Sequence, residues 1–477
     1  MQELWAHQKD AVAKARLRDS FALFMEMGTG KTRTQIEILR EHYGSVKRLS
    51  STLIFCPPVV ITNWKREFNT YSKIPSSRIV CLVGSAKKRV KDLTEFLAQG
   101  HGQGIAITNY EALLMPELYA ALNAWGPEIL ILDESHRVKN HSAKRTKAAI
   151  QLADKAKRRF LLSGTPVLNS PMDLFAQYRI MDRGWSMGKN FFAFRARYFY
   201  DKNAGMPRDR HFPNWQIRPG ALDELTGILN RTSVRVKKEE CLDLPPLVRQ
   251  DIPVEMLPEQ ARHYEEMKND FVTYIQSQAC VASLAITKAL RLQQIVSGFA
   301  RVDEPEGSRD QPKNVSFGET PRERALCDLL EEICPHHKVI VWAVFRENYA
   351  AIRQACTSLG IKFVEVHGDV PGTQKSAAVE EFSSDPATRV LIGHPGSGGI
   401  GINLVAASYM IYFSRNFSLE QYLQSQARNH RGGSEIHEKI TEIHLYTPGT
   451  IDELVMKRLA QKEEMGEALL RDLSQKL

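Results

Sequence analysis

The chain has 477 residues, of which 43% are hydrophobic and 25% charged, and it carries a net charge of +9. This length is too great for a single hydrophobic core, so we expect two or three domains. The sequence has no apolar run of membrane-spanning length, and its first ten residues lack the core of a signal peptide. Seven scattered cysteines without a Cys-x-x-Cys pair are typical of reduced thiols, so a cytoplasmic protein is predicted.

The segment from Phe21 to Thr32 has the pattern of a phosphate-binding loop. A compact apolar run predicts a buried strand over Phe21–Phe24, and a helical pattern begins at Thr32. Glycines between them let the backbone approach a phosphate, and the helix N-terminus offers unpaired N–H groups. The predicted contacts with ATP and Mg²⁺ come from Gly28, Thr29, Gly30, Lys31 and Thr32, with Lys31 on the outer phosphates and the Thr32 hydroxyl on the metal. An ordinary helix opened by a Gly-Lys-Thr turn is the alternative, because the strict pattern has glycine where this chain has Met25.

An acidic pair follows a strand that is apolar on both faces. Strands alternate with helices throughout this half, which predicts a doubly wound parallel α/β sheet. Asp133 and Glu134 would therefore lie at the carboxyl edge of the sheet, where such folds bind ligands. We expect Asp133 to hold Mg²⁺ and Glu134 to deprotonate the attacking water, although an acidic pair can also simply cap a helix. The predicted strands are Phe21–Phe24, Thr52–Cys56, Ile79–Val83, Ile105–Thr108, Glu128–Leu132 and Arg159–Ser163.

Six motifs occur in a fixed order: Gln8, Glu26–Thr32, Cys56–Pro58, Thr108–Glu111, Asp133–His136 and Ser163–Asn169. In this order they resemble the first motor domain of superfamily 2 helicases and, more narrowly, Swi/Snf-type DNA translocases. The family commonly has Asp-Glu-Met-Gly-x-Gly-Lys-Thr, which accounts for Met25. The amide of Gln8 could read an adenine edge, since it offers a donor and an acceptor. The resemblance implies that Ser163 and Thr165 report the state of the bound phosphate.

In the second half strands again alternate with helices, which predicts a second sheet of the same class. Leu419–Arg431 reads as one amphipathic helix with Gln424, Arg428 and Arg431 on one face. Two arginines can clamp a γ-phosphate during transfer, although a solvated basic face is the alternative. The three residues resemble the family's Gln-x-x-x-Arg-x-x-Arg motif. The predicted strands are Ile252–Met256, Val339–Val344, Phe363–Val366, Arg389–Ile392, Met410–Phe413 and Ile440–Tyr446.

Three further segments carry glycines or many basic and aromatic residues. Gly396–Leu404 resembles the family's fifth motif, which implies that Gly401 and Asn403 couple nucleic-acid contact to the nucleotide site. The run Arg137–Lys147 is interpreted as a solvated basic helix face, with nucleic-acid contact as the alternative. Aromatic and basic residues fall at helical spacing in a third segment, where a core stripe is favoured over a base-stacking surface. They are Phe191, Phe194, Arg195, Tyr198 and Phe199.

The resemblance extends over nearly the whole chain and implies two tandem RecA-like α/β domains with a nucleotide cleft between them. The domains are predicted at 1–242, with a helical insertion at about 181–240, and 243–477, with one at about 258–300. We expect a monomeric, DNA-dependent ATPase that moves along double-stranded DNA in replication, recombination or repair, in a bacterial or phage-infected cell. A strand-separating DNA or RNA helicase and an ATP-switched nucleic-acid clamp are the alternatives. Candidate nucleic-acid contacts are Trp64, Lys65, Asn109, Tyr110 and Ser397.

Overall fold

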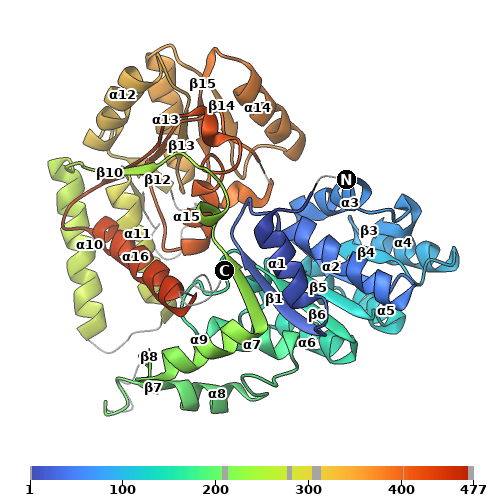
Figure 1. The fold of residues 1–477 in the computed structure, drawn as a ribbon. Coiled ribbons are helices and arrows are strands. Elements are labelled where there is room, and N and C mark those ends of the chain that lie inside the picture. Colours follow the sequence, from blue (N-terminus) through green and yellow to red (C-terminus); the bar gives the residue numbers. More distant parts are fainter. Residues whose placement is uncertain (1–2, 207–212, 277–281, 303–312, 401, 471–477) are drawn as a thin grey trace.

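The computed structural model describes residues 3–206, 213–276, 282–302, 313–400 and 402–470 and contains two large parallel sheets (Figure 1). The first sheet has the strand order β3-β4-β2-β5-β6-β1-β9. Its strands are β1 (Ser20–Met25), β2 (Thr52–Phe55), β3 (Ile79–Cys81), β4 (Ile105–Thr108), β5 (Ile129–Asp133), β6 (Arg158–Leu162) and β9 (Ser233–Val236). Every residue of the central strand β5 is buried, because helices cover both faces of the sheet.

Helices of the first half enclose two hydrophobic clusters, one on each side of this sheet. The helices are α1 (Ala6–Ala15), α2 (Lys31–Val46), α3 (Ile61–Tyr71), α4 (Ala86–Ala98), α5 (Pro116–Trp125), α6 (Lys144–Lys155), α7 (Asp173–Met181), α8 (Phe191–Tyr198) and α9 (Ala221–Thr232). Short 3₁₀ turns, among them η1 (Pro58–Val60), η3 (Tyr110–Leu114) and η4 (Ser135–Val138), follow the carboxyl ends of β2, β4 and β5.

The second sheet has the order β10-β17-β16-β13-β15-β14 and is also parallel. Its strands are β10 (Leu247–Pro253), β13 (Val339–Trp342), β14 (Lys362–Val366), β15 (Thr388–Gly393), β16 (Tyr409–Tyr412) and β17 (Ile440–Tyr446). The helices of this half are α10 (Pro258–Gln276), α11 (Ala282–Val296), α12 (Pro321–Ile333), α13 (Arg346–Ser358), α14 (Gly372–Ser384), α15 (Leu419–Gln426) and α16 (Ile451–Leu470). A small hairpin, β11 (Phe299–Val302) with β12 (Lys313–Ser316), follows α11. The predicted fold class, two α/β parallel sheets, is confirmed.

Three local expectations differ from the structure. The strand predicted at Ile252–Met256 is β10, which lies several residues earlier and is exposed along most of its length, so its apolar pattern is weak. The helix predicted to run to Arg431 ends at Gln426, and the chain turns there because the Arg428 carbonyl accepts the backbone N–H of Leu404. The segment 181–240 is not only helical. It contains the hairpin β7 (Phe199–Asp201) with β8 (Trp215–Ile217), and it ends in β9, which pairs with β1.

The last helix, α16, connects the two halves. It begins beside the second sheet and packs on α9, and Leu469 is fully buried in a core cluster of the first half. The Thr226 hydroxyl donates to the Leu469 carbonyl at 3.1 Å. Glu467 forms ion pairs with Arg235 and Lys237 beside β9. Across the described residues, no helix combines the length and the apolar character needed to span a membrane.

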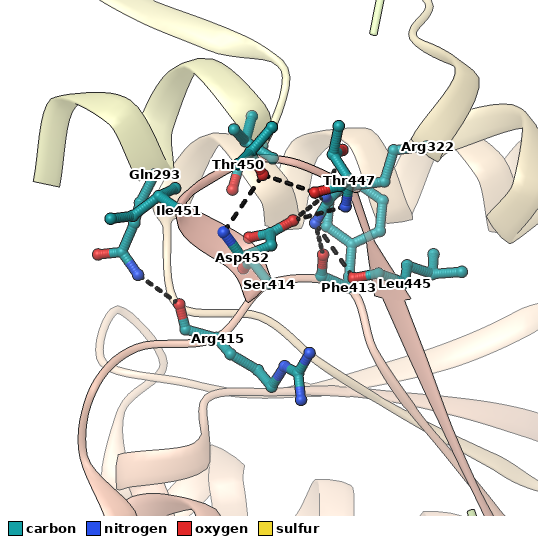
Figure 2. A network of polar contacts seen from close by, with 12 residues as sticks. Gln293, Arg322, Phe413, Ser414, Arg415, Leu445, Thr447, Thr450, Ile451 and Asp452 are labelled. Atoms are coloured by element: carbon teal, nitrogen blue, oxygen red, sulfur yellow. Dashed lines mark hydrogen bonds and ion pairs between the residues drawn. The ribbon is translucent and has the colours of Figure 1, made fainter. Parts of the chain in front are cut away.

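A buried arginine holds together the edge of the second sheet from which α15 departs (Figure 2). The Arg322 guanidinium donates to the Phe413 carbonyl at 2.8 Å and to the Thr447 hydroxyl at 3.1 Å, and it pairs with Asp452. Asp452 also accepts the backbone N–H of Thr447 at 3.0 Å. These contacts join the start of α12, the ends of β16 and β17 and the start of α16.

We expect Arg322→Leu to lower the free energy of unfolding of the second half by about 3–5 kcal/mol, because Asp452 would stay buried without its partner. Arg324→Leu on the same helix is the matched control: its ion pair with Glu319 is exposed, so it should cost no more than about 1 kcal/mol. Urea unfolding followed by circular dichroism measures both. Equal losses for the two variants would contradict this assignment.

Candidate functional site

A cavity of about 920 Å³ lies between the two halves of the chain. Its walls come from the glycine loop, the acidic pair, the loop that follows η6 (Pro395–Ile400), and the segment at the end of α15. The predicted site residues that line it are Gly28, Gly30, Lys31, Thr32, Asp133, Glu134, Asn403, Gln424, Arg428 and Arg431. Residues predicted from opposite ends of the sequence thus face one space. Gly401 lies outside the described residues.

The loop between β1 and α2 requires glycine for two reasons. Gly28 and Gly30 have φ angles of 89° and 82°, a left-handed conformation that other residues rarely adopt. A Cβ atom on Gly30 would also lie only 2.2 Å from Nε2 of Gln8. The Thr29 hydroxyl donates to the Glu26 carbonyl at 2.8 Å and closes the turn. Helix α2 begins at Lys31, so the unpaired backbone N–H groups of its first turn lie where the loop borders the cavity.

The Lys31 ammonium lies against the loop that precedes it. Its Nζ donates to the Met25 carbonyl at 2.8 Å and to the Glu26 carbonyl at 3.3 Å. Carbonyl oxygens do not neutralise the ammonium charge, so this charge is available to a polyphosphate in the cavity.

Gln8 lies on α1, outside the large cavity but next to it. Its side chain is buried, and its Oε1 accepts the backbone N–H of Trp5 at 3.0 Å. It lines a neighbouring cavity of about 280 Å³ together with Trp5, Arg33 and Tyr71, and Gly30 borders both cavities. A base could therefore occupy the small cavity while its phosphates occupy the large one.

Asp133 and Glu134 lie at the carboxyl end of β5, as predicted. Burial and the neighbouring charge of Glu134 raise the pKa of Asp133 to about 6. A divalent cation would relieve this repulsion, and the Asp133 carboxylate and Thr32 hydroxyl are the oxygen ligands that Mg²⁺ prefers. Glu134 has a φ of 53°, a left-handed conformation that is strained for a residue other than glycine and is often found at functional sites.

The predicted nucleic-acid contacts divide into buried and accessible residues. Trp64 and Tyr110 lie in the core: the Trp64 indole donates to Oδ2 of Asp133 at 2.9 Å, and the Tyr110 hydroxyl donates to its carbonyl at 2.7 Å. Asn109 is buried and accepts from Arg89 at 2.6 Å. These three do not offer a surface to a nucleic acid in this structure; two of them instead fix Asp133. Lys65 and Ser397 are half-buried.

A buried histidine connects the predicted coupling residues to the acidic pair. Nδ1 of His136 lies 3.3 Å from Oγ of Ser163 and 3.4 Å from Oε2 of Glu134, and Ser163 accepts the backbone N–H of Thr165. Nε2 of His136 lies 3.0 Å from Oε1 of Glu420 on α15. The sequence pattern gives His136 no role beyond its place in the Asp133–His136 motif, and it gives Glu420 none. Thr165 borders a separate cavity of about 310 Å³ between the halves.

The contact with His136 joins the two halves of the chain. Burial alone would raise the pKa of Glu420, but the hydrogen bond and charge of His136, with the charges of Arg137 and Lys139, outweigh it and lower that pKa to about 2. Glu420 is therefore an anion that holds α15 against the element carrying Glu134. The packing of η1 against η6 brings the same two halves together at a second place.

Arg428 and Arg431 lie in the turn after α15, where Arg428 is buried and Arg431 is half-buried. Burial lowers the pKa of Arg428 to about 10, and the charge of Arg431 acts in the same direction. A Cβ atom on Gly28 would lie 3.9 Å from Cβ of Arg431, so this segment reaches the glycine loop. Gln424 lies in the last turn of α15 and faces the same cavity. The predicted arginine pair therefore meets the predicted phosphate loop, although not on one continuous helix.

The model of the SNF2-related domain matches residues 9–298, and the model of the helicase conserved C-terminal domain matches residues 322–433. The first match alone covers more than half of the chain. This chain belongs to the SNF2-related family. The predicted resemblance is confirmed.

Two curated relatives of this SNF2-related chain are similar over almost its full length. The chromodomain-helicase-DNA-binding protein 1-like of Danio rerio is 24% identical over 454 residues, which cover 94% of this chain and 41% of the relative. The DNA annealing helicase and endonuclease ZRANB3 of Mus musculus is 26% identical over 505 residues, covering 100% of this chain and 41% of the relative. The chain thus spans less than half of the length of these relatives. A solved structure, the Sulfolobus solfataricus SWI2/SNF2 ATPase core in complex with dsDNA, is 21% identical, with a TM-score of 0.44 and coverage of 99% of this chain and 93% of that one.

A second buried network of hydrogen bonds holds α15 against strand β17. Glu442 on β17 accepts from the Tyr422 hydroxyl at 2.5 Å and from Nε2 of Gln426 at 2.7 Å, and it pairs with His444. Burial would raise the pKa of Glu442, but the hydrogen bonds from His444, Gln426 and Tyr422 outweigh this effect and lower it. The Tyr412 hydroxyl and Ser425 add a contact at 2.7 Å. Glu442 therefore sets the position of the helix that leads into Arg428.

We expect Glu442→Gln to reduce the kcat of nucleotide hydrolysis by roughly 10- to 100-fold, because a small displacement of the arginine segment misplaces its charges. The KM for nucleotide should change little, since the glycine loop lies on the other sheet. Glu380→Gln, an exposed position on α14, is the matched control for loss of a carboxylate in this half. Steady-state hydrolysis assays measure both constants, and a variant with unchanged kcat would contradict a positioning role for Glu442.

Proposed function

We propose that this protein is an ATP-driven motor that moves along double-stranded DNA. One observation carries the proposal: the Lys31 loop and the acidic pair of one sheet share a single cavity with Arg428 and Arg431 of the other. A nucleotide-switched binding protein needs only the first set of residues. Stabilisation of a phosphoryl-transfer transition state requires a second set of cations in the same cavity.

The first half binds the nucleotide. Gln8 contacts the adenine edge, while Gly28, Thr29, Gly30 and Lys31 hold the phosphates in the loop. Thr32 and Asp133 hold Mg²⁺, which when bound neutralises phosphate charge. Glu134 orients the attacking water and accepts its proton.

The second half completes the reaction. Gln424, Arg428 and Arg431 stabilise the charge that spreads over the γ-phosphate during transfer. Loss of the phosphate removes the anion that holds these buried cations against the glycine loop, so the two halves separate. Ser163 and Thr165 pass this change from Glu134 through His136, and Gly401 and Asn403 pass it to the DNA contacts of the second half. The units 1–242 and 243–477 then grip the DNA alternately.

The relatives and the net charge of the chain both support DNA as the polymer along which the protein moves. The relatives include a DNA annealing helicase and, in Gallus gallus, the DNA repair and recombination protein RAD54B, which is 26% identical over 94% of this chain. These names favour a role in replication, recombination or repair. The net charge of +9 suits a polyanionic partner, and Lys65 and Ser397 remain candidate contacts with it. Affinity for DNA should fall with salt, because contacts to phosphate dominate it.

We expect Lys31→Ala and Glu134→Gln each to reduce DNA-stimulated ATP hydrolysis by at least about 100-fold. The first removes the phosphate contact, whereas the second removes the base and leaves ATP binding intact. Phosphate release with and without a 40-bp duplex measures the effect. Lys14→Ala and Glu41→Gln, on α1 and α2 outside the cavity, serve as controls for charge loss. Hydrolysis that survives in either site variant would refute the assignment.

A motor that follows duplex DNA without opening it should displace the third strand of a triplex. We expect triplex displacement to depend on ATP and to be lost in Glu134→Gln, while a labelled strand of a forked duplex stays annealed. Strand displacement without triplex displacement would instead favour a strand-separating helicase. ATP-dependent binding with neither activity would favour a clamp.

A further inference from the structure

Two sequence features outside the nucleotide cavity meet on the surface of the first half. His141, from the basic run after the acidic pair, stacks on Phe191 of α8 with ring centroids 3.6 Å apart and an interplanar angle of 14°. The Arg195 guanidinium lies 4.0 Å from the ring centroid of Trp215 and 5.2 Å from that of Phe192. We name this group, His141, Phe191, Phe192, Arg195 and Trp215, the aromatic platform.

The structure divides the aromatic stripe of α8 between two environments. Phe194, Tyr198 and Phe199 are buried in the core, as a core stripe requires. Phe192 is 64% exposed, and Phe191, Arg195 and Trp215 are partly exposed beside it. Packing explains the first group, and it partly explains Phe191 and Trp215, which lie against the core cluster, but it does not explain the exposed Phe192. Figure 1 shows α8 with the β7–β8 hairpin at the outer edge of the first half, beyond α7 and α9.

The surroundings of the aromatic platform are strongly basic. Residues 182–206 and 213–218 carry six Lys or Arg side chains and two Asp side chains, a net charge of +4 where the whole chain has +9. Both acids are engaged by the backbone: Asp182 accepts the N–H groups of Gly184, Trp185 and Ser186, and Asp201 accepts those of Asn203 and Asn214. Lys189 and Lys202 are exposed. Arg197 pairs with Glu224 of α9, which leaves a local net charge of +3 that favours an anion.

The histidine of the platform behaves as a neutral aromatic ring. Burial lowers the pKa of His141, and the charges of Arg195 and Lys147 lower it further. At neutral pH the ring therefore stacks on Phe191 without a charge of its own, and the cations at its border supply the charge. A neutral stacking surface bordered by cations combines the two contacts that unpaired nucleotides need, a π-face for the base and a positive charge for the phosphate.

We propose that the aromatic platform binds single-stranded nucleic acid, with a base stacked on Phe192 and the adjoining phosphates held by the surrounding lysines and Arg195. Double-stranded DNA presents base edges in its grooves and keeps the faces of its bases stacked, so it cannot use an exposed phenylalanine in this way. The inference rests on the proposed function only in taking a nucleic acid as the track. It adds a preference for substrates in which a duplex adjoins unpaired nucleotides.

The test compares Phe192→Ala with wild type by fluorescence anisotropy, using labelled 20-nucleotide oligo(dT), oligo(U) and a 20-bp duplex without added nucleotide. We expect the variant to bind the single strands roughly 5- to 100-fold more weakly, as for loss of one stacked base, and the duplex within twofold of wild type. Arg195→Gln should reduce the salt dependence of single-strand binding by about 0.7 in the slope of log K against log salt. Comparison of the DNA and RNA strands shows which of the two is preferred.

Tyr43→Ala is the matched control, because Tyr43 is 53% exposed on α2 outside the platform. It should bind both single strands as wild type does, and thermal unfolding shows that all variants are folded. Unchanged single-strand binding by Phe192→Ala would overturn the proposal, as would an equal loss for single strands and duplex. Failure of the motor proposal is read separately, from wild type that lacks duplex-stimulated ATP hydrolysis.

Discussion

The arrangement depends on positive charges from both halves of the chain that line one cavity. Arg428 is buried and Arg431 is half-buried beside the glycine loop, and burial lowers the pKa of both. Burying a cation is costly unless a partner compensates it. The acids that line the cavity among the described residues, Glu67, Asp133 and Glu134, all belong to the opposite half of the chain. We propose that a polyphosphate held among Lys31, Arg428 and Arg431 attracts cations from both halves, so that its binding favours their closure.

The parallel topology of both sheets brings these groups to one place. In each sheet the strands are parallel, so all loops at the carboxyl ends lie on one edge. The glycine loop follows β1 and the acidic pair follows β5, which β6 separates from β1. On the other sheet, β16 leads into α15. The network around Arg322 holds the end of β16, and the network around Glu442 holds α15 itself. The contact of His136 with Glu420 then joins the two edges directly.

The sequence predicts those parts of the site that depend on local pattern. The glycines, Lys31 and the acidic pair are recognisable because a phosphate loop and a strand-end carboxylate need particular residues at particular spacings. The orientation of a side chain is not encoded so locally. Trp64 and Tyr110 turn inward to bond Asp133, although their motifs alone permitted a role at the surface. Glu420 contacts His136, and Glu442 contacts Tyr422 and Gln426, all more than ten residues away in the sequence. Strand β10 lacks an apolar pattern because it is an exposed edge strand.

The most direct test of the account asks whether nucleotide held by the first half is also held by the second. Hydrogen–deuterium exchange measures this on the unmodified chain, with and without Mg²⁺ and a non-hydrolysable ATP analogue. The account predicts slower exchange both in peptides that contain Lys31 and in peptides that contain Arg428 and Arg431, about 400 residues later in the sequence. Both effects should disappear in Lys31→Ala. Protection confined to the glycine loop would contradict a site shared by the two halves.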